Sequence, residues 1–333
     1  MLLDEAERLH CTETDPEKTM KGAVLLLDQE KAYNWVEWPF LHAALQQYGL
    51  SGSWLNVILD YYSKPSLGWF LVNGFKSKRV DITRGLQQGN PLSPILYNMA
   101  FEAFLATVRV RINGIRCHGI CFKVQALADN TLPFVDSPSD LAILEEIIDH
   151  FGMASGSKLN DQKCVLIPLY GDRQNWTDRF PTLGTGDITR YLGALFSRTG
   201  ISISDQQQKL TDSLKERLDG WKDRNLSTKG RVLALNTLLL SKIWFSVAFT
   251  AYSNPFLDWV EKAISDFIWE YRKQPWVNLQ DMSLPREKGG LGLMPLRAQI
   301  DGLHLRWWKE LWDPKNTTKW AVLTRQLLEV RIN

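Results

Sequence analysis

Apolar and polar positions alternate along the first 200 residues in a way that predicts strands and helices in turn. The run GAVLLLD at 22–28 is apolar until its final acid, which is the pattern of a buried strand. Two apolar runs around a short polar turn predict a hairpin over 124–135. Asn34 followed by Glu37 resembles a capping box, so a helix is expected to begin near Asn34. The other patterns predict a helix from 38 to 62 broken at Gly49–Gly52, a strand–turn–strand unit at 70–80, helices over 94–112 and 139–152, and strands over 163–169 and 191–196.

Beyond about residue 200 the strand pattern fades and helical spacing dominates. Helices are expected at about 205–220, 227–250 and 255–271, and the stretch GGLGL at 289–293 precedes a last helical region rich in tryptophan. Alternating strands and helices that give way to helices alone indicate an α+β domain with a helical appendage. No stretch of the sequence reaches the ~18 uninterrupted apolar residues of a membrane helix, so no membrane span is expected.

The net charge of the chain does not indicate a class of partner, but the distribution of charge indicates a candidate phosphate-binding surface. The 333 residues carry a net charge of only +2, yet residues 209–242 hold eight basic and four acidic side chains. Such a mildly basic helical segment is either a solvated face or a surface for phosphates. Cys117 and Cys121 flank His118 without a second ligand pair, so thiols are expected there rather than a zinc site. Few cysteines, and a first segment without a basic start or an apolar core, indicate a reducing, intracellular location.

Two acids end apolar runs that lie about a hundred residues apart. Asp28 closes the first predicted strand, and Asp129 sits at the tip of the predicted hairpin. If the two strands are neighbours in one sheet, their carboxylates can converge on a cation, as paired acids do in phosphoryl-transfer enzymes that hold two Mg²⁺ ions. Any domain of this size has acids at strand ends. The pair alone therefore does not distinguish a metal site from an ordinary turn.

The order of several longer motifs narrows these alternatives. The motifs are LDQEKAYNWVEW (27–38), RGLQQGNPLSPILYNM (84–99), ALADNT (126–131), SGSKLNDQKC (155–164) and RYLGALF (190–196). From about residue 20 to the C-terminus the chain resembles reverse transcriptases of non-LTR (LINE-type) retrotransposons. The resemblance implies an α+β fold: a polymerase palm, in which an antiparallel sheet is backed by helices, with partial fingers and a helical thumb. The expected domains are a polar N-terminal remnant at 1–20, the palm with partial fingers at 21–200, the thumb-like region at 201–275 and a helical extension at 276–333.

The resemblance also implies roles for individual residues. Asp28 and Asp129 match ligands of two Mg²⁺ ions, for which Mn²⁺ can substitute, and Lys163 matches a lysine at the nucleotide phosphates. The implied nucleotide-binding residues are Tyr33, Gln88, Gly89 and Pro91, and the implied nucleic-acid-binding residues are Arg84, Tyr191, Gly193, Lys229 and Arg231, the last two behind Ser227 as an expected N-cap. The implied partners are an RNA template, a DNA primer and a dNTP; the family implies residence in the nucleus, and no protein partner is indicated.

Three residues near the hairpin depart from the family pattern. Asn130 stands where the family has a second aspartate of the catalytic set, Leu127 replaces an aromatic residue, and Pro133 falls in an expected central strand, where it removes a ladder donor. A unit charge at about 4 Å in an effective dielectric of 20 is worth roughly 4 kcal/mol. Losing half of this in the transition state would slow the reaction about thirtyfold.

Only 27 residues precede Asp28, so most of the family's fingers region is expected to be missing. The sequence therefore predicts a truncated, degenerate copy with little or no polymerase activity. Three hypotheses stay open: an RNA-directed DNA polymerase core that is active or weakly active and uses two Mg²⁺ ions, a relic without useful catalysis that still binds RNA or DNA, and an unrelated α+β protein.

Overall fold

The computed structural model describes residues 21–62, 66–69, 71–169, 176–270 and 276–332 of the chain. The predicted N-terminal remnant at 1–20 lies outside the described residues. The chain forms two compact units: the first comprises residues 1–192 and 197–200, and the second comprises residues 193–196 and 201–333.

A four-stranded antiparallel sheet forms the centre of the first unit. Its strand order is β10 (Val165–Leu169), β1 (Gly22–Leu26), β9 (Asn130–Val135) and β8 (Val124–Leu127). Every residue of β1 is buried, as its apolar sequence predicts. The predicted hairpin over 124–135 is confirmed, because β8 and β9 pair through a two-residue turn at Ala128 and Asp129.

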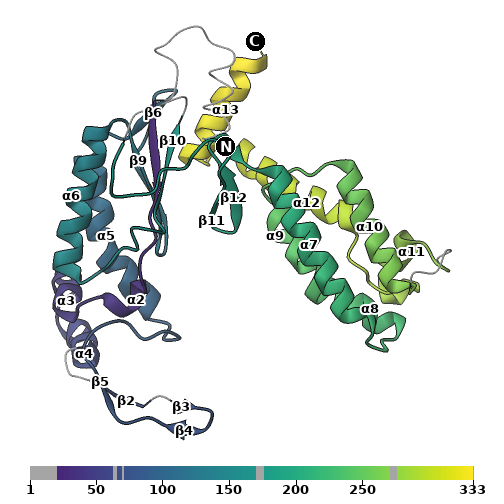
Figure 1. Cartoon of the computed structure of the whole chain (residues 1–333), viewed down its shortest axis with the longest axis horizontal. Coiled ribbons are helices and arrows are strands. Elements are labelled where there is room, and N and C mark those ends of the chain that lie inside the picture. Colours follow the sequence, from purple (N-terminus) through teal and green to yellow (C-terminus); the bar gives the residue numbers. More distant parts are fainter. Residues whose placement is uncertain (1–20, 63–65, 70, 170–175, 271–275, 333) are drawn as a thin grey trace. The chain divides into compact units, whose positions relative to one another are not determined.

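Helices pack on one face of this sheet (Figure 1). The alternate residues Ala23, Leu25 and Leu27 point into a core shared with α3 (Trp38–Gln47), α5 (Ser93–Arg111) and α6 (Pro138–Ser155). Leu26, on the opposite face, packs against Ile167 and Leu183. Because side chains alternate along the strand, the side chain of Asp28 points away from the helices.

Smaller elements complete the first unit. They are α2 (Ala32–Trp35), α4 (Ser53–Tyr62), the paired strands β2 (Ser66–Gly68) and β5 (Val80–Ile82), the hairpin β3 (Leu71–Val72) and β4 (Phe75–Lys76), and the hairpin β6 (Ile115–Cys117) and β7 (Ile120–Phe122). The predicted capping box is wrong. Asn34 lies inside α2, whereas Glu37 is the N-cap position of α3 and makes no side-chain cap there.

The single strand predicted over 191–196 is also wrong. The structure has β11 (Thr189–Tyr191) and β12 (Ala194–Ser197), which together with β13 (Gly200–Ile201) form a three-stranded sheet. Leu192 and Gly193 make the turn between β11 and β12 with φ values of 48° and 88°. Positive φ at both positions is the geometry of a tight hairpin turn, which ends a strand that apolar residues alone would continue.

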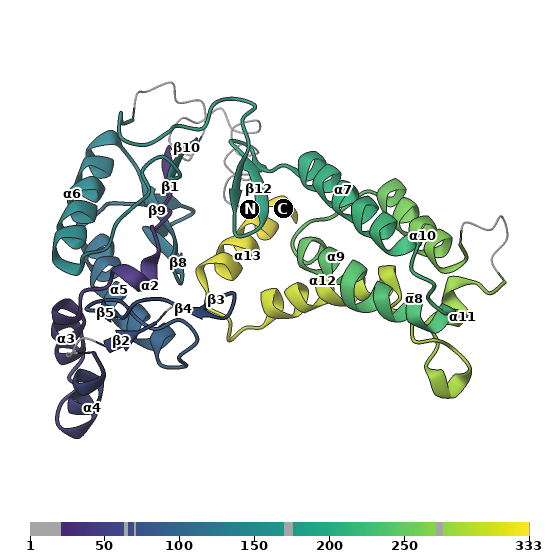
Figure 2. The same ribbon diagram turned by 60° about the horizontal axis from the view of Figure 1, so that its bottom comes forward.

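The second unit is mainly helical, as predicted (Figure 2). Its elements are α7 (Ile203–Lys222), α8 (Thr228–Ala234), a π-helical turn (Leu235–Leu239), α9 (Leu240–Val247), α10 (Asn254–Ile268), α11 (Leu279–Ser283), a 3-10 turn (Arg286–Lys288), α12 (Leu296–Trp312) and α13 (Lys319–Ile332). Residues of α7, α8, α9, α10, α11 and α12 pack together in one apolar core. Among the described helices, none is long and apolar enough to cross a bilayer. The predicted α+β class, with an antiparallel sheet backed by helices, is confirmed.

Candidate active site

The end of β1 lies beside the tip of the β8–β9 hairpin. Leu27 donates its backbone N–H to the carbonyl oxygen of Thr131 at 3.0 Å, in line with the pairing of Val24 with Phe134. Continuing this register places Asp28 opposite Asn130. Asp28 is exposed, and Asp129 and Asn130 are half-exposed. The structure therefore brings Asp28 to the same edge of the sheet as Asp129 and Asn130, which lie about a hundred residues later in the sequence.

The hairpin tip holds its polar side chains close together. Asn130 Nδ2 donates to Asp129 Oδ1 at 3.3 Å. The tip and the end of β1 thus offer two carboxylates and one amide oxygen, and oxygen is the donor that Mg²⁺ prefers. Among the described residues, no group of three or more His, Cys, Asp or Glu side chains is arranged to hold a metal. The donor set fits one hard divalent cation through two carboxylates, and Asn130 supplies no charge.

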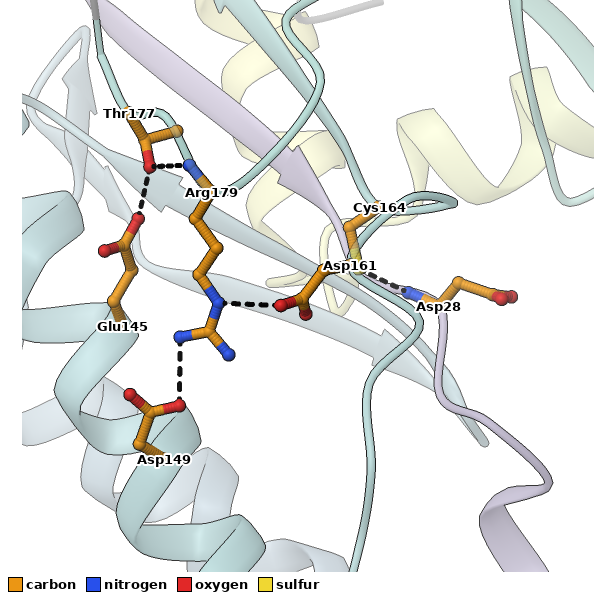
Figure 3. A network of polar contacts seen from close by, with 7 residues as sticks. All are labelled: Asp28, Glu145, Asp149, Asp161, Cys164, Thr177 and Arg179. Carbon is orange, nitrogen blue, oxygen red and sulfur yellow. Dashed lines mark hydrogen bonds and ion pairs between the residues drawn. The ribbon is translucent and has the colours of Figure 1, made fainter.

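The backbone of Asp28 is held on its other side by the segment before β10. Asn160 donates its N–H to the Asp28 carbonyl at 3.0 Å, and the Asp28 N–H donates to Cys164 Sγ at 3.4 Å (Figure 3). Lys163 is exposed on the turn between these two residues. Burial raises the pKa of the Cys164 thiol to about 11, so the thiol is protonated at neutral pH.

An aromatic stack lies next to this edge. The rings of Tyr33 and Tyr97 are stacked with centroids 4.7 Å apart, and the Tyr97 hydroxyl donates to Gln29 Oε1 at 2.8 Å. Burial raises the pKa of Tyr97, and the negative charge of Asp129 raises it further. Sequence reasoning missed Tyr97 and Gln29, although both lie in the quoted motifs and Tyr97 is on the buried face of a predicted helix.

The loop before α5 is fixed to the Tyr33 segment through its backbone. Gly85 donates its N–H to the Val36 carbonyl at 2.8 Å, and Leu86 donates to the Tyr33 carbonyl at 2.7 Å. Gly85 has a φ of 85°, and a Cβ there would lie 2.7 Å from the Asn34 carbonyl oxygen. A side chain at position 85 would collide with the Asn34 backbone, so this position requires glycine.

The predicted contact residues of this loop are all exposed. Gln88, Gly89 and Pro91 lie between Leu86 and the start of α5. The Arg84 guanidinium packs over the Trp35 ring at 4.0 Å from its centroid and pairs with Glu37 at 3.4 Å. The contacts of Gln88, Gly89 and Pro91 with the nucleotide, and of Arg84 with the template, stay predictions.

Pro133 occupies the central strand β9, as expected, and interrupts its ladder. It pairs with Val124 of β8, while on the β1 side continuing the register places it opposite Leu25. Pairing with β1 is formed at Val24 and resumes only at Leu27. The amide nitrogen of proline carries no hydrogen, which accounts for the gap.

Of the remaining predicted residues, Tyr191 belongs to the first unit, and Gly193, Lys229 and Arg231 belong to the second. Tyr191 packs against the cluster of Leu26, Ile167 and Leu183 on the sheet face opposite the helices. Gly193, in the second unit, lies so close to Phe245 that a Cβ would be 2.8 Å from its ring. Lys229 is exposed on the first turn of α8, whose N-cap is Ser227 as predicted.

Arg231 is buried within the second unit. It donates to the Phe267 carbonyl at 2.8 Å and pairs with Glu270 at 2.7 Å. Because Arg231 belongs to α8 and Phe267 to α10, these bonds join the two helices. This placement favours a structural role for Arg231 over the phosphate contact predicted from sequence.

Comparison with known proteins decides the family. Residues 5–194 match the family described as "Reverse transcriptase (RNA-dependent DNA polymerase)". The chain belongs to this reverse transcriptase family. The antiparallel sheet with α5 and α6 accordingly corresponds to the palm of the reverse transcriptase fold.

Curated relatives of this chain are proteins of transposable elements. It is 27% identical over 299 residues to the "Transposon TX1 uncharacterized 149 kDa protein" of Xenopus laevis, which covers 85% of the chain and 22% of the relative. It is 25% identical over 293 residues to the "Retrovirus-related Pol polyprotein from type-2 retrotransposable element R2DM" of Drosophila melanogaster, covering 84% and 27%. The predicted resemblance to reverse transcriptases of non-LTR retrotransposons is thereby confirmed. The chain spans about a quarter of the length of these two relatives.

A solved structure similar to this chain is that of telomerase from Candida Tropicalis in complex with a fragment of telomeric RNA. The identity is 12% and the TM-score is 0.45, and the match covers 97% of this chain and 51% of the telomerase chain.

Proposed function

We propose that the palm of this chain is an RNA-directed DNA polymerase core whose catalysis is impaired at position 130. The observation that supports this most directly is the hydrogen bond from Leu27 to Thr131, because it sets Asp28 beside the hairpin that carries Asp129. These two carboxylates would hold a divalent cation, Mg²⁺ or Mn²⁺. When bound, such ions activate the attacking hydroxyl and neutralise the leaving pyrophosphate.

The other residues of the site position the reactants. Tyr33, held against Tyr97, would place its ring under the sugar of the incoming dNTP and exclude a 2′-hydroxyl. Gln88, Gly89 and Pro91 would contact the nucleotide from the loop that Gly85 fixes to the Tyr33 segment. Lys163 would donate a proton to the departing pyrophosphate.

Nucleic acid would be held by further residues of the chain. Arg84 would contact the template, and Tyr191, with the turn at Gly193, would contact the primer strand. The partners would be an RNA template and a DNA primer, and the location would be the nucleus.

The impairment follows from the charge at Asn130. An amide oxygen can coordinate a cation but adds no negative charge, and the Asn130 amide already donates to Asp129. The site therefore attracts a divalent ion less strongly than one with three carboxylates.

Primer extension tests the proposal. The Asn130→Asp variant is expected to extend a DNA primer on an RNA template with Mg²⁺ or Mn²⁺, and the double variant Asn130→Asp with Asp28→Asn is expected not to extend it. Equal extension by both variants would show that Asp28 does not carry the chemistry.

A second candidate function is nucleic-acid binding without catalysis. It is favoured by exposed basic residues of the second unit, including Lys222 and Arg224 at the end of α7 and Lys229 on α8. A gel shift with single-stranded RNA should weaken as salt rises, because phosphate contacts release counterions. Binding that is insensitive to salt would exclude phosphate contacts by this segment.

A further inference from the structure

A short segment of the chain runs beside the residues that follow β1. Glu30 donates its N–H to the Lys158 carbonyl at 2.9 Å, and Gln29 forms an antiparallel bridge with Leu159. The segment 158–160, which precedes the start of β10, thus continues the pairing beside β1 and reaches the Asp28 backbone.

The turn between this segment and β10 closes around Asp28. Lys163 and Cys164 both donate their N–H groups to the Asn160 carbonyl, at 2.9 and 3.0 Å. This tight turn buries Cys164, whose sulfur accepts the Asp28 N–H at 3.4 Å, while Asn160 donates to the Asp28 carbonyl at 3.0 Å. Both backbone polar groups of Asp28 are therefore bound by residues 160–164.

An arginine holds the same turn against a helix. Arg179 Nε lies 3.1 Å from Asp161 Oδ2 in the turn, and its Nη1 lies 2.9 Å from Asp149 Oδ1 on α6 (Figure 3). Thr177 holds the backbone of Arg179. The Thr177 hydroxyl accepts the backbone N–H of Arg179 at 3.0 Å and donates to Glu145 of α6 at 2.7 Å. The turn is thereby connected to the body of the palm.

We propose that Cys164 and Arg179 are positioning residues for Asp28. Cys164 sets the Asp28 backbone directly, and Arg179 does so through Asp161 and the turn. The side chain of Asp28 points away from the network, so neither residue touches the reacting atoms (Figure 3). The inference rests on the proposed function, because it assigns the network to the orientation of a metal-binding carboxylate.

Direct measurement of Mn²⁺ affinity tests this without any turnover. The full chain is titrated with Mn²⁺ and free ion is followed by electron paramagnetic resonance, beside urea unfolding of each variant. Removing a group that orients a metal ligand typically lowers affinity at least about tenfold, so Cys164→Ala is expected to bind Mn²⁺ about tenfold more weakly. Cys164→Ser keeps an acceptor and is expected to retain wild-type affinity. Arg179→Met is expected to weaken binding as well.

Arg297 provides the matched control. It bridges Asp258 and Glu261 in the second unit, with its Nε 3.1 Å from Glu261 Oε1, as Arg179 bridges two acids in the palm. Arg297→Met is expected to leave Mn²⁺ affinity unchanged.

The outcomes separate the two proposals. Wild-type Mn²⁺ affinity in both Cys164→Ala and Arg179→Met, with weaker binding in Asp28→Asn, overturns the positioning role alone. Wild-type affinity in Asp28→Asn overturns the proposed metal site and the positioning role with it. An equal loss of affinity in Arg297→Met would trace the effect to general destabilisation and would likewise overturn the inference. If Cys164→Ala does not fold, Arg179→Met decides the question.

Discussion

The nitrogen of Pro133 falls opposite Leu25 in the register of β9 and β1, and the ladder between these strands is interrupted there. Replacing Pro133 by valine supplies the missing N–H at similar side-chain volume. Because an added intramolecular hydrogen bond contributes about 1 kcal/mol, the free energy of unfolding should rise by that amount in urea titrations.

Pro168 provides the control for this substitution. It pairs with Ala23 in β10, but the amide of Leu166, two residues earlier on the same side, donates to Pro181 rather than to β1. An N–H restored at Pro168 would therefore find no partner in β1. A stability gain in Pro168→Val equal to that in Pro133→Val would contradict the account of the interrupted ladder.

Substitutions at two glycines of the loop before α5 distinguish the cost of backbone strain from the cost of a steric clash. Gly85 and Gly89 both have positive φ, but only at Gly85 would a Cβ approach another atom, the Asn34 carbonyl oxygen at 2.7 Å. Gly89→Ala should cost about 1–2 kcal/mol from the backbone conformation, and Gly85→Ala should cost more. Thermal or urea unfolding measures both, and equal losses would show that the Asn34 contact yields without cost.

Tyr33 should set the choice between deoxynucleotides and ribonucleotides. In the Asn130→Asp background, Tyr33→Ala removes the ring and should reduce discrimination against ribonucleotides about tenfold or more, within the 1–3 kcal/mol that a steric pocket supplies. Tyr33→Phe keeps the ring and should retain the discrimination. Single-nucleotide incorporation with dNTP or NTP gives the ratio, and an unchanged ratio in Tyr33→Ala would remove Tyr33 from this role.

Stability at high pH should depend on Tyr252 in the second unit. Burial raises its pKa above the ordinary value of 10, although the hydrogen bond with Ser246 opposes the rise. A raised pKa in the folded state gives stability that is complete below pH 10 and is lost as pH climbs through the folded value. The loss is bounded by about 1.4 kcal/mol per pH unit and is smaller for a partly buried phenol.

The variant Tyr252→Phe isolates this effect. Urea unfolding between pH 9 and 11 should show a shallower decline in the variant than in the wild type. Parallel declines would assign the pH dependence to other groups.

The sequence predicted most of the elements and the meeting of Asp28 with the hairpin, because buried strands and a short turn leave a strong local pattern. The error at Asn34 has a tertiary cause. Glu37 pairs with Arg84 instead of capping a helix, and the Asn34 backbone lies against Gly85. A capping pattern could not reveal these contacts, which come from a loop fifty residues away.

The same limit applies to the residues around the site. Cys164 and Arg179 act through contacts with Asp28 and Asp161 that depend on the packed sheet, and a lone cysteine or arginine carries no local signal. Arg231 shows the converse, since its place in a basic segment indicated a phosphate contact while the structure engages it within the helical core.

We propose that Asp28 and Asp129 share a cation site that the neutral side chain of Asn130 weakens. The most direct test compares single-nucleotide addition by the wild type and by Asn130→Asp at saturating primer, template and Mg²⁺. If half of the roughly 4 kcal/mol of a nearby charge acts in the transition state, the variant should be about thirtyfold faster. Equal rates in the two proteins would contradict the account.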